Sequence, residues 1–206
     1  MKLTRPLVCA SASPRRHELL RRLGLDFEVY RTDVPEVLPE GYDPARAPEY
    51  LARLKLAATE ARQDAGELVL AADSVVLLGD DLLGKPTDLD DARATLRRLC
   101  GARHEVVTGY ALGWADPSTR RRRIHSRAVS TYVTLAPATE REIDYYLARE
   151  APLDRAGSYG VQDWIGVAKA TRLEGSYTNV MGLPTQELWA DLVRLGFAGV
   201  GERAAG

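Results

Sequence analysis

The chain has 206 residues, of which 45% are hydrophobic and 28% charged, and its formal net charge is −1. This length suits one domain, or two lobes that share a sheet, with a sizeable core. The near-zero charge excludes the overall basic surface of a dedicated nucleic-acid binder, so any binding of polyanions must be local. No segment approaches the ~18 consecutive apolar residues of a membrane-spanning helix, and we expect a cytoplasmic protein.

Two cysteines, Cys9 and Cys100, lie far apart in the sequence and lack the spacing of metal ligands. Cys9 falls inside an apolar segment. Two reduced thiols are therefore the favoured interpretation, and a disulfide is the alternative.

The first informative segment runs from Leu7 to Gly24. From Leu7 the segment reads as a buried strand that leads directly into a helix, with Ser13 as N-cap, Pro14 at the first helical position and Gly24 as the stop. A helix N-terminus carries unpaired N–H groups and a partial positive charge, so it attracts anions. The polar residues at this start predict a phosphate site: Ser11, Ser13, Arg15 and Arg16.

A proline-rich acidic segment, Thr32 to Pro48, reads as a long loop, and a loop of this length in a compact domain is more often functional than idle. Glu36 is our choice among its acids. The chain from Pro48 to Ala65 then has helical spacing, with Lys55 beside the apolar stripe. Lys55 either serves a site or covers the core edge with its stem while its ammonium reaches water.

Asp73 interrupts the most apolar run of the chain, residues 67–78, which predicts a central strand covered on both faces. A carboxylate there is costly unless it is paired, binds a cation or lies at a cleft; the alternative is a structural carboxylate bonded to backbone N–H groups. A hairpin turn at residues 79–81 would return the chain so that Val76 faces Lys85. At ~3.3 Å per residue Lys85 is then about 10 Å from Asp73 along the strand, so the two side chains can reach the same cavity. The alternative is that residues 84–86 only lead the chain out of the strand, without a role in a site.

The remaining chain alternates helices, strands and glycine-rich loops. We expect helices after Asp88, after the capping box at Thr139 and from Thr185 to Leu195, and strands over 104–114 and 124–135. The hairpin tip between these strands carries Arg120 to Arg123, which favours a solvated loop over nucleic-acid binding because no aromatic platform accompanies it. Two glycine-rich segments, 152–163 and 173–184, contain Gln162 and Asn179, whose amides can read a base edge or a phosphate.

Seven motifs, taken together and in this order, resemble the Maf family, whose members hydrolyse nucleoside triphosphates to the monophosphate and pyrophosphate. They are the segments 11–16 (SASPRR), 52–55 (ARLK), 72–76 (ADSVV), 84–86 (GKP), 108–109 (TG), 156–162 (AGSYGVQ) and 175–184 (GSYTNVMGLP). The resemblance implies a Maf/ITPase-like α/β fold: an elongated, mixed, twisted sheet flanked by helices, with two lobes and a central substrate cleft. Residues 1–206 would form this single domain, with a disordered tail from about residue 197.

The resemblance also implies roles for single residues. Asp73 would be the proton acceptor for the attacking water, with Lys55 and Lys85 as further catalytic residues, and Glu36 and Asp73 would hold a divalent cation, Mg²⁺ or Mn²⁺. The substrate-binding set would be Ser11, Ser13, Arg15, Arg16, Ser74 and Gln162. Within this set Arg15, Ser74 and Gln162 resemble the subfamily that hydrolyses dTTP and UTP, although Ser74 stands where we expect threonine and Asp163-Trp164 stand where small residues are usual.

Three functions follow as hypotheses. The first is a metal-dependent pyrophosphatase acting on dTTP, UTP and modified pyrimidine nucleotides in a housecleaning role. The second is a regulatory protein that binds a nucleotide or a cell-division partner without turnover, and the third is a phosphatase that removes only the γ-phosphate. The expected partner is a nucleoside triphosphate, with no membrane and no nucleic acid; the oligomeric state stays open, a homodimer being one alternative.

Overall fold

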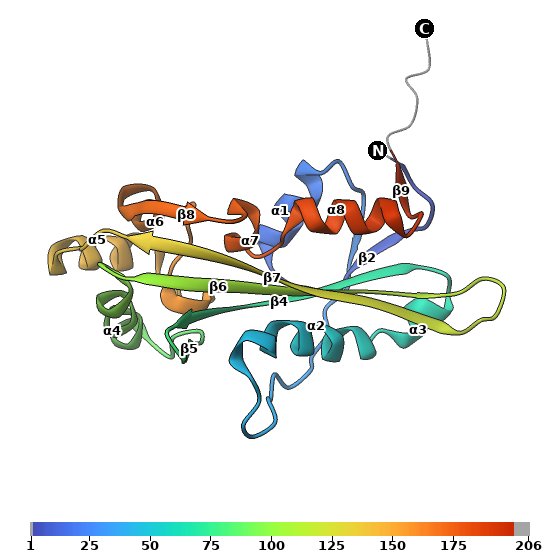
Figure 1. The fold of residues 1–206 in the computed structure, drawn as a ribbon, viewed down its shortest axis with the longest axis horizontal. Helices are drawn as coiled ribbons and strands as arrows, with labels where there is room; N and C mark the ends of the chain where they lie inside the picture. The colour runs from blue at the N-terminus through green and yellow to red at the C-terminus, as the bar shows by residue number, and fades with distance from the viewer. Residues whose placement is uncertain (1, 200–206) are drawn as a thin grey trace, which may run out of the picture.

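A mixed sheet organises the computed structural model, which describes residues 2–199 (Figure 1). Across these residues seven strands form the sheet in the order β3-β2-β4-β6-β7-β8, with β5 paired to the edge of β4. Among residues 2–199, β2 pairs in parallel with β3 and β4, and the other strand pairs of this sheet are antiparallel. The strands are β2 (Leu7–Cys9), β3 (Glu28–Val29), β4 (Leu68–Leu78), β5 (Asp81–Leu83), β6 (Arg103–Ala115), β7 (Arg122–Leu135) and β8 (Ala170–Glu174).

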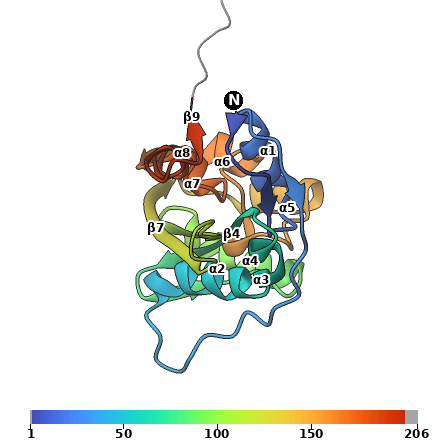
Figure 2. The ribbon, with the colours of Figure 1, turned by 90° about the vertical axis from the view of Figure 1, so that its right-hand side faces the viewer.

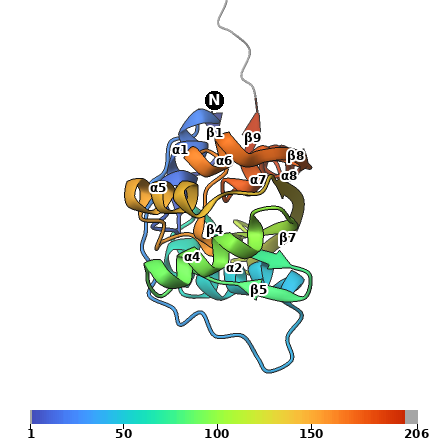
Figure 3. The same cartoon turned by 90° about the vertical axis from the view of Figure 1, so that its left-hand side faces the viewer.

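Helices cover both faces of this sheet, as the two side views show (Figures 2 and 3). One face carries α2 (Ala47–Ala57) and α3 (Glu60–Asp64), and the other carries α1 (Pro14–Arg22) and α8 (Thr185–Arg194). The mixed α/β architecture with flanking helices is therefore confirmed. The remaining helical segments are η1 (Pro44–Arg46), α4 (Leu89–Leu99), α5 (Glu140–Glu150), η2 (Ala156–Ser158), α6 (Trp164–Lys169) and α7 (Tyr177–Val180).

Strand β4 lies at the centre of the core. Its successive side chains alternate between the two faces of the sheet. Val69 and Ala71 are buried with Ala52 and Leu56 of α2. Their neighbours at 68, 70 and 72 are buried in the larger cluster that contains residues of α1 and α8. By the same alternation Asp73 faces the α2 side and the residue after it faces the α1 side.

Two predicted elements differ in detail from the structure. The expected helix from Pro48 to Ala65 is two helices, because the backbone turns at Thr59, where the hydroxyl donates to the carbonyl of Leu56 at 2.7 Å and Gln63 Nε2 donates to that carbonyl at 3.1 Å. The hairpin after β4 is tighter than expected: Leu78 pairs with Asp81, so Val76 faces Leu83 and not Lys85. Lys85 lies just beyond the end of β5.

The prediction of a disordered tail is wrong for residues 197–199. Phe197 is buried and its ring meets that of Trp114 edge-on at 5.0 Å. The next residues form β9 (Ala198–Gly199), which pairs with β1 (Lys2–Leu3). Burial of this aromatic side chain and the pairing with β1 stabilise the ordered conformation of these residues. Residues 200–206 lie outside the described residues.

In the part of the chain that the structure describes, no helix has the length and apolar character needed to cross a membrane. Cys9 and Cys100 are both free thiols, as expected from the sequence.

Candidate active site

An interruption in strand pairing creates the candidate site. On one side of β4, β2 pairs as far as Leu70 and β5 pairs only from Val76 onward. Between them, residues 71–75 have no partner strand on that side among residues 2–199. On the other side β4 pairs continuously with β6 from Val69 to Leu77, which holds the strand in place. Side chains from both faces of β4 can therefore reach one opening.

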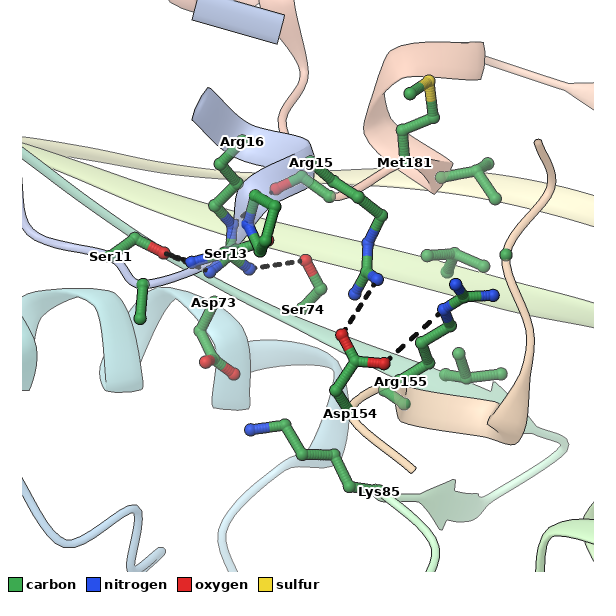
Figure 4. Close-up of a pocket in the computed structure, with 18 of the residues that line it drawn as sticks. Ser11, Ser13, Arg15, Arg16, Asp73, Ser74, Lys85, Asp154, Arg155 and Met181 are labelled. Carbon is green, nitrogen blue, oxygen red and sulfur yellow. Dashed lines mark hydrogen bonds and ion pairs between the residues drawn. The ribbon is translucent and has the colours of Figure 1, made fainter. Parts of the chain in front are cut away.

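A cavity of about 430 Å³ occupies this opening (Figure 4). The segment from Ala10 to Arg16, which includes the N-terminus of α1, forms one wall. Ten site residues predicted from the sequence line the cavity: Ser11, Ser13, Arg15, Arg16, Glu36, Lys55, Asp73, Ser74, Lys85 and Gln162. The structure thus brings together residues from across 150 positions of the sequence.

Lys55 lies between two carboxylates at the charged end of the cavity, which Glu36, Lys55, Asp73 and Lys85 form. From α2 its Nζ lies 2.5 Å from Asp73 Oδ1 and 2.7 Å from Glu36 Oε1. The side chains of Lys55 and Asp73 are only 13% and 12% exposed. Lys85 lies further out, with its Nζ 3.9 Å from Glu36 Oε2 and its side chain 59% exposed. Two carboxylates therefore share one mostly buried ammonium, and a second ammonium stands at the rim.

The Glu36 carboxyl shows the balance of charge at this end. Partial burial alone would raise its pKa, but the hydrogen bond and charge of Lys55, helped by Lys85 and Arg16, hold the pKa below its usual value. Glu36 is thus ionised over the physiological range, which makes it available to a cation.

Arg16 connects three elements around the cavity. Its guanidinium donates to Ser11 Oγ at 3.1 Å, to Ser74 Oγ at 3.1 Å and to the carbonyl of Gly182 at 2.8 Å. Burial lowers the pKa of Arg16, whereas the nearby Asp73 carboxylate acts in the opposite direction. A guanidinium has five N–H donors, so Arg16 can position Ser11 and Ser74 and still donate to an anion.

Arg15 meets an acidic residue that sequence analysis missed. Its Nη1 lies 3.2 Å from Asp154 Oδ2, and Arg155 Nε lies 3.6 Å from Asp154 Oδ1. Figure 4 shows both arginines directed at this one carboxylate, above Lys85. Asp154 stands in a position that a phosphate oxygen could take, because a carboxylate and a phosphate offer similar acceptors to arginine.

Another part of the cavity wall is apolar. Val76 and Val106, paired across β4 and β6, line it together with Tyr159 and Met181. Gly157 of η2 packs directly on Val76, since a Cβ added there would lie 2.9 Å from Val76 Cγ2. The cavity therefore has a charged end around Asp73 and an apolar end around Val76, with Gln162 among its lining residues.

The residues fit a divalent cation that shares its coordination with phosphates. No cluster of three or more His, Cys, Asp or Glu residues that could hold a metal occurs within residues 2–199. Mg²⁺ is usually bound by one or two carboxylates plus substrate phosphates and water, not by a complete protein cage. Glu36 and Asp73, brought together by the Lys55 ammonium, offer the two hard carboxylates that such a site needs.

Two further sequence-based expectations concern residues outside the cavity wall. Asn179 does not face a ligand: it is fully buried, and its Nδ2 donates to the carbonyl of Val106 and to Thr131 Oγ1. In the hairpin tip, Arg122 pairs with Glu60 and Asp64, and Arg123 lies 3.8 Å from an oxygen of Asp116. Acidic neighbours thus engage part of the arginine cluster.

Comparison with known proteins gives the family. The model of the family described as "Maf-like protein" matches residues 6–195. The chain belongs to the Maf family. Among curated relatives of this Maf protein, one from Porphyromonas gingivalis, named dTTP/UTP pyrophosphatase, is 43% identical over 194 residues, covering 92% of this chain and 94% of that protein.

Two other relatives carry the same name, dTTP/UTP pyrophosphatase. The protein of Geobacter sulfurreducens is 43% identical over 92% of this Maf chain and 96% of its own length. That of Flavobacterium psychrophilum is 38% identical over 91% and 93% respectively. The resemblance drawn from the sequence motifs is confirmed. Among solved structures, the Staphylococcus aureus Ham1 protein aligns with 63% of this chain and 72% of that chain at 18% identity and a TM-score of 0.40, a likeness too low to support any argument.

Proposed function

We propose that this Maf protein hydrolyses dTTP and UTP, and modified pyrimidine nucleoside triphosphates, to the monophosphate and pyrophosphate. The observation that carries the proposal is the two-ended cavity, with a cluster of cations and carboxylates around Asp73 and an apolar compartment around Val76. A nucleotide has the same two ends. The relatives named dTTP/UTP pyrophosphatase, about 40% identical over more than nine-tenths of the chain, support the choice of substrate and bond.

In the proposed reaction a water molecule attacks the α-phosphorus of the substrate. The new bond joins the water oxygen to phosphorus, the bond to the bridging oxygen breaks, and pyrophosphate leaves with the electron pair. Asp73 takes the proton from the water, because it is the carboxylate that β4 presents to the opening. Lys55 holds Asp73 Oδ1 at 2.5 Å, which orients the carboxylate and leaves Oδ2 for the water.

The cationic residues bind the substrate and stabilise the charge that develops on the leaving group. A nucleoside triphosphate carries roughly four negative charges, and Lys85, Arg15 and Arg16 are placed around the charged end to meet them. Glu36 and Asp73 would hold Mg²⁺ or Mn²⁺, which offsets the charge of the phosphates. Ser11, Ser13 and Ser74 would donate to phosphate or ribose oxygens, and Gln162 would contact the base. Removing one well-placed donor of this kind typically costs on the order of 10²–10³ in rate.

Product identification tests the proposal. The protein is incubated with Mg²⁺ or Mn²⁺ and each of the common nucleoside triphosphates, and the products are separated. Pyrophosphate from dTTP and UTP is the expected result. Orthophosphate alone would instead identify a γ-phosphatase, and binding without any product would identify a nucleotide-sensing protein.

The substitution Asp73→Asn tests the proton acceptor. Asparagine keeps the shape of the side chain but is a far weaker base, so we expect a loss of turnover of at least about 10³-fold with near-wild-type circular dichroism. Nucleotide binding, measured by calorimetry without turnover, should persist in this variant. Activity close to that of the wild type would show that another group accepts the proton.

Three broader expectations accompany this function. We infer a single domain of two lobes around the cleft, a cytoplasmic location where its nucleotide substrates occur, and a homodimer as the assembly to test by light scattering. None of these is needed for the chemistry above.

A further inference from the structure

We propose that Asp163 is a positioning residue that locks the side-chain amide of Gln162 in one orientation and thereby makes the site discriminate uracil and thymine from cytosine. The inference rests on the proposed function, because it concerns the base of that substrate. Its physical basis is a largely buried polar network at the cavity wall, formed by residues of α5, the loop before η2 and the N-cap of α6.

The network centres on the Asp163 carboxylate, which is 8% exposed. Arg155 forms an ion pair with it, and the buried Tyr146 hydroxyl donates to Oδ2 at 3.0 Å. Arg155 also donates to the Tyr146 hydroxyl at 3.2 Å. Arg155 and Tyr146, which come from separate segments, thus hold this carboxylate in a fixed place.

Gln162 donates from Nε2 to Asp163 Oδ1 at 3.2 Å. Rotating an amide side chain by 180° about its last bond exchanges the positions of its oxygen and nitrogen, and the two arrangements differ only in their hydrogen bonds. An ionised carboxylate only accepts hydrogen bonds, so only the NH₂ end of Gln162 can face Asp163. The orientation of the amide is therefore fixed by chemistry.

Two local features show that the chain is built for this contact. Asp163 is the N-cap residue of α6, yet its side chain makes no capping hydrogen bond. Aspartate at that position normally accepts from a backbone N–H of the first turn, so here its side chain is diverted to Arg155 and Gln162. Gly160 makes room for the pair, since a Cβ there would lie 2.5 Å from Gln162 Nε2 and 2.6 Å from Asp163 Oδ2.

The other end of the amide lacks a partner. Gln162 lines the cavity, and its Oε1 is a buried atom with no hydrogen-bond partner among the described residues. A buried acceptor left unpaired is unfavourable, and a donor supplied by the occupant of the cavity would offset this cost. With the amide locked, Gln162 offers an acceptor at Oε1 and the second N–H of Nε2 as a donor.

This pattern matches one class of pyrimidine. Uracil and thymine present an N3–H donor beside the O4 acceptor, and the locked amide pairs with both. Cytosine presents the reverse, an N3 acceptor beside an N4 amino donor, and would need the amide turned around. Because Asp163 prevents that turn, cytosine leaves hydrogen-bonding groups mismatched, and a site built to read such groups rejects the mismatch strongly.

The test compares kcat/KM for UTP and CTP in variants of Asp163. Wild type should favour UTP by about tenfold or more. In Asp163→Asn the new amide oxygen stays with the donors Arg155 and Tyr146, so its NH₂ faces Gln162 and turns that amide over; the UTP/CTP ratio should fall by at least about tenfold and move toward CTP. In Asp163→Gly the lock is absent and Gln162 can turn freely, so the ratio should approach one without inverting.

Matched variants separate positioning from general damage. Tyr146→Phe removes a hydrogen bond from the same carboxylate but leaves the partner of Gln162 unchanged, so its UTP/CTP ratio should equal that of the wild type whatever its stability. Asp163→Glu keeps an acceptor-only group and should retain the preference for UTP. Each variant is checked for folding by near-ultraviolet circular dichroism, and glycine, a tolerated N-cap residue, serves if the asparagine variant does not fold.

The outcomes distinguish this inference from the proposed function. A wild type that releases no pyrophosphate from either UTP or dTTP overturns the proposed function. A wild type that hydrolyses UTP and CTP equally well, or Asp163→Asn and Asp163→Gly variants that keep the wild-type ratio, overturns the role of Asp163 alone.

Discussion

Lys55 should contribute to folding as well as to catalysis, and the substitution Lys55→Met tests this directly. Methionine keeps the length and apolar stem of lysine but removes the ammonium that lies 2.5 Å from Asp73 and 2.7 Å from Glu36. Because Lys55 and Asp73 are nearly buried, the variant leaves carboxylates at the charged end of the cavity without their main counter-charge.

The size of the effect follows from the burial of the pair. Removing one partner of a fully buried ion pair costs about 3–5 kcal/mol; with roughly an eighth of each side chain exposed and Lys85 near Glu36, we expect about 2–4 kcal/mol. With a urea m-value of about 2–3 kcal/mol/M for a domain of this size, the midpoint of unfolding should fall by about 1 M. Lys85→Met is the matched control, since Lys85 is mostly exposed and its loss should cost under about 1 kcal/mol.

Urea titrations followed by fluorescence and circular dichroism measure both midpoints, and turnover of UTP is measured in parallel. Both variants should lose activity, but only Lys55→Met should lose substantial stability. Adding Asp73→Asn to Lys55→Met should restore part of that stability, because the uncompensated charge is then removed as well. Equal midpoints for the two lysine variants would refute a buried counter-ion role for Lys55.

Two further predictions address the core. His104 is buried, its Nε2 lies 2.6 Å from the Tyr159 hydroxyl, and burial lowers its pKa to about 4. In the unfolded chain the same imidazole has a pKa of about 6.5. The free energy of unfolding should therefore fall by about 2 kcal/mol between pH 7.5 and pH 5 through this group. His104→Gln should remove that part of the pH dependence of the unfolding free energy, and an unchanged slope would contradict it. Gly109→Ala should lower the free energy of unfolding by about 3 kcal/mol or more, because its Cβ would lie 2.2 Å from the backbone nitrogen of Glu49. Gly84→Ala is the control, since a Cβ there has no atom of the described residues within 4 Å and should leave the thermal midpoint unchanged. Equal midpoints for the two variants would show that α2 can shift.

The site could be predicted from the sequence to the extent that its residues belong to contiguous motifs. The sequence indicates Asp73, because a carboxylate inside an apolar strand is costly unless it is paired, binds a cation or lies at a cleft. It indicates Lys55 and Arg16, because their motifs occur in the same order as in the Maf family. The cavity gathers these residues as expected. Their individual roles in the reaction stay predictions.

Contacts between distant segments could not be predicted in the same way. The residues next to Asp154 in the sequence do not indicate that it contacts Arg15, 139 positions away. Asn179 has a side chain suited to hydrogen bonding with a base, but its amide donates to buried groups of the core instead. The hairpin register was wrong by two residues because turn residues 79–81 admit more than one pairing. Such features depend on which side chains the fold brings together, which residue patterns along the chain do not encode individually.

Strand β4 also fixes one spacing along the site. Asp73 and Val76 lie three residues apart on a strand that β6 holds in register, so their backbones are about 10 Å apart along β4, and this spacing does not depend on the loops around the cavity. A nucleotide whose base rests at the apolar end presents to Asp73 whichever phosphorus lies at that distance.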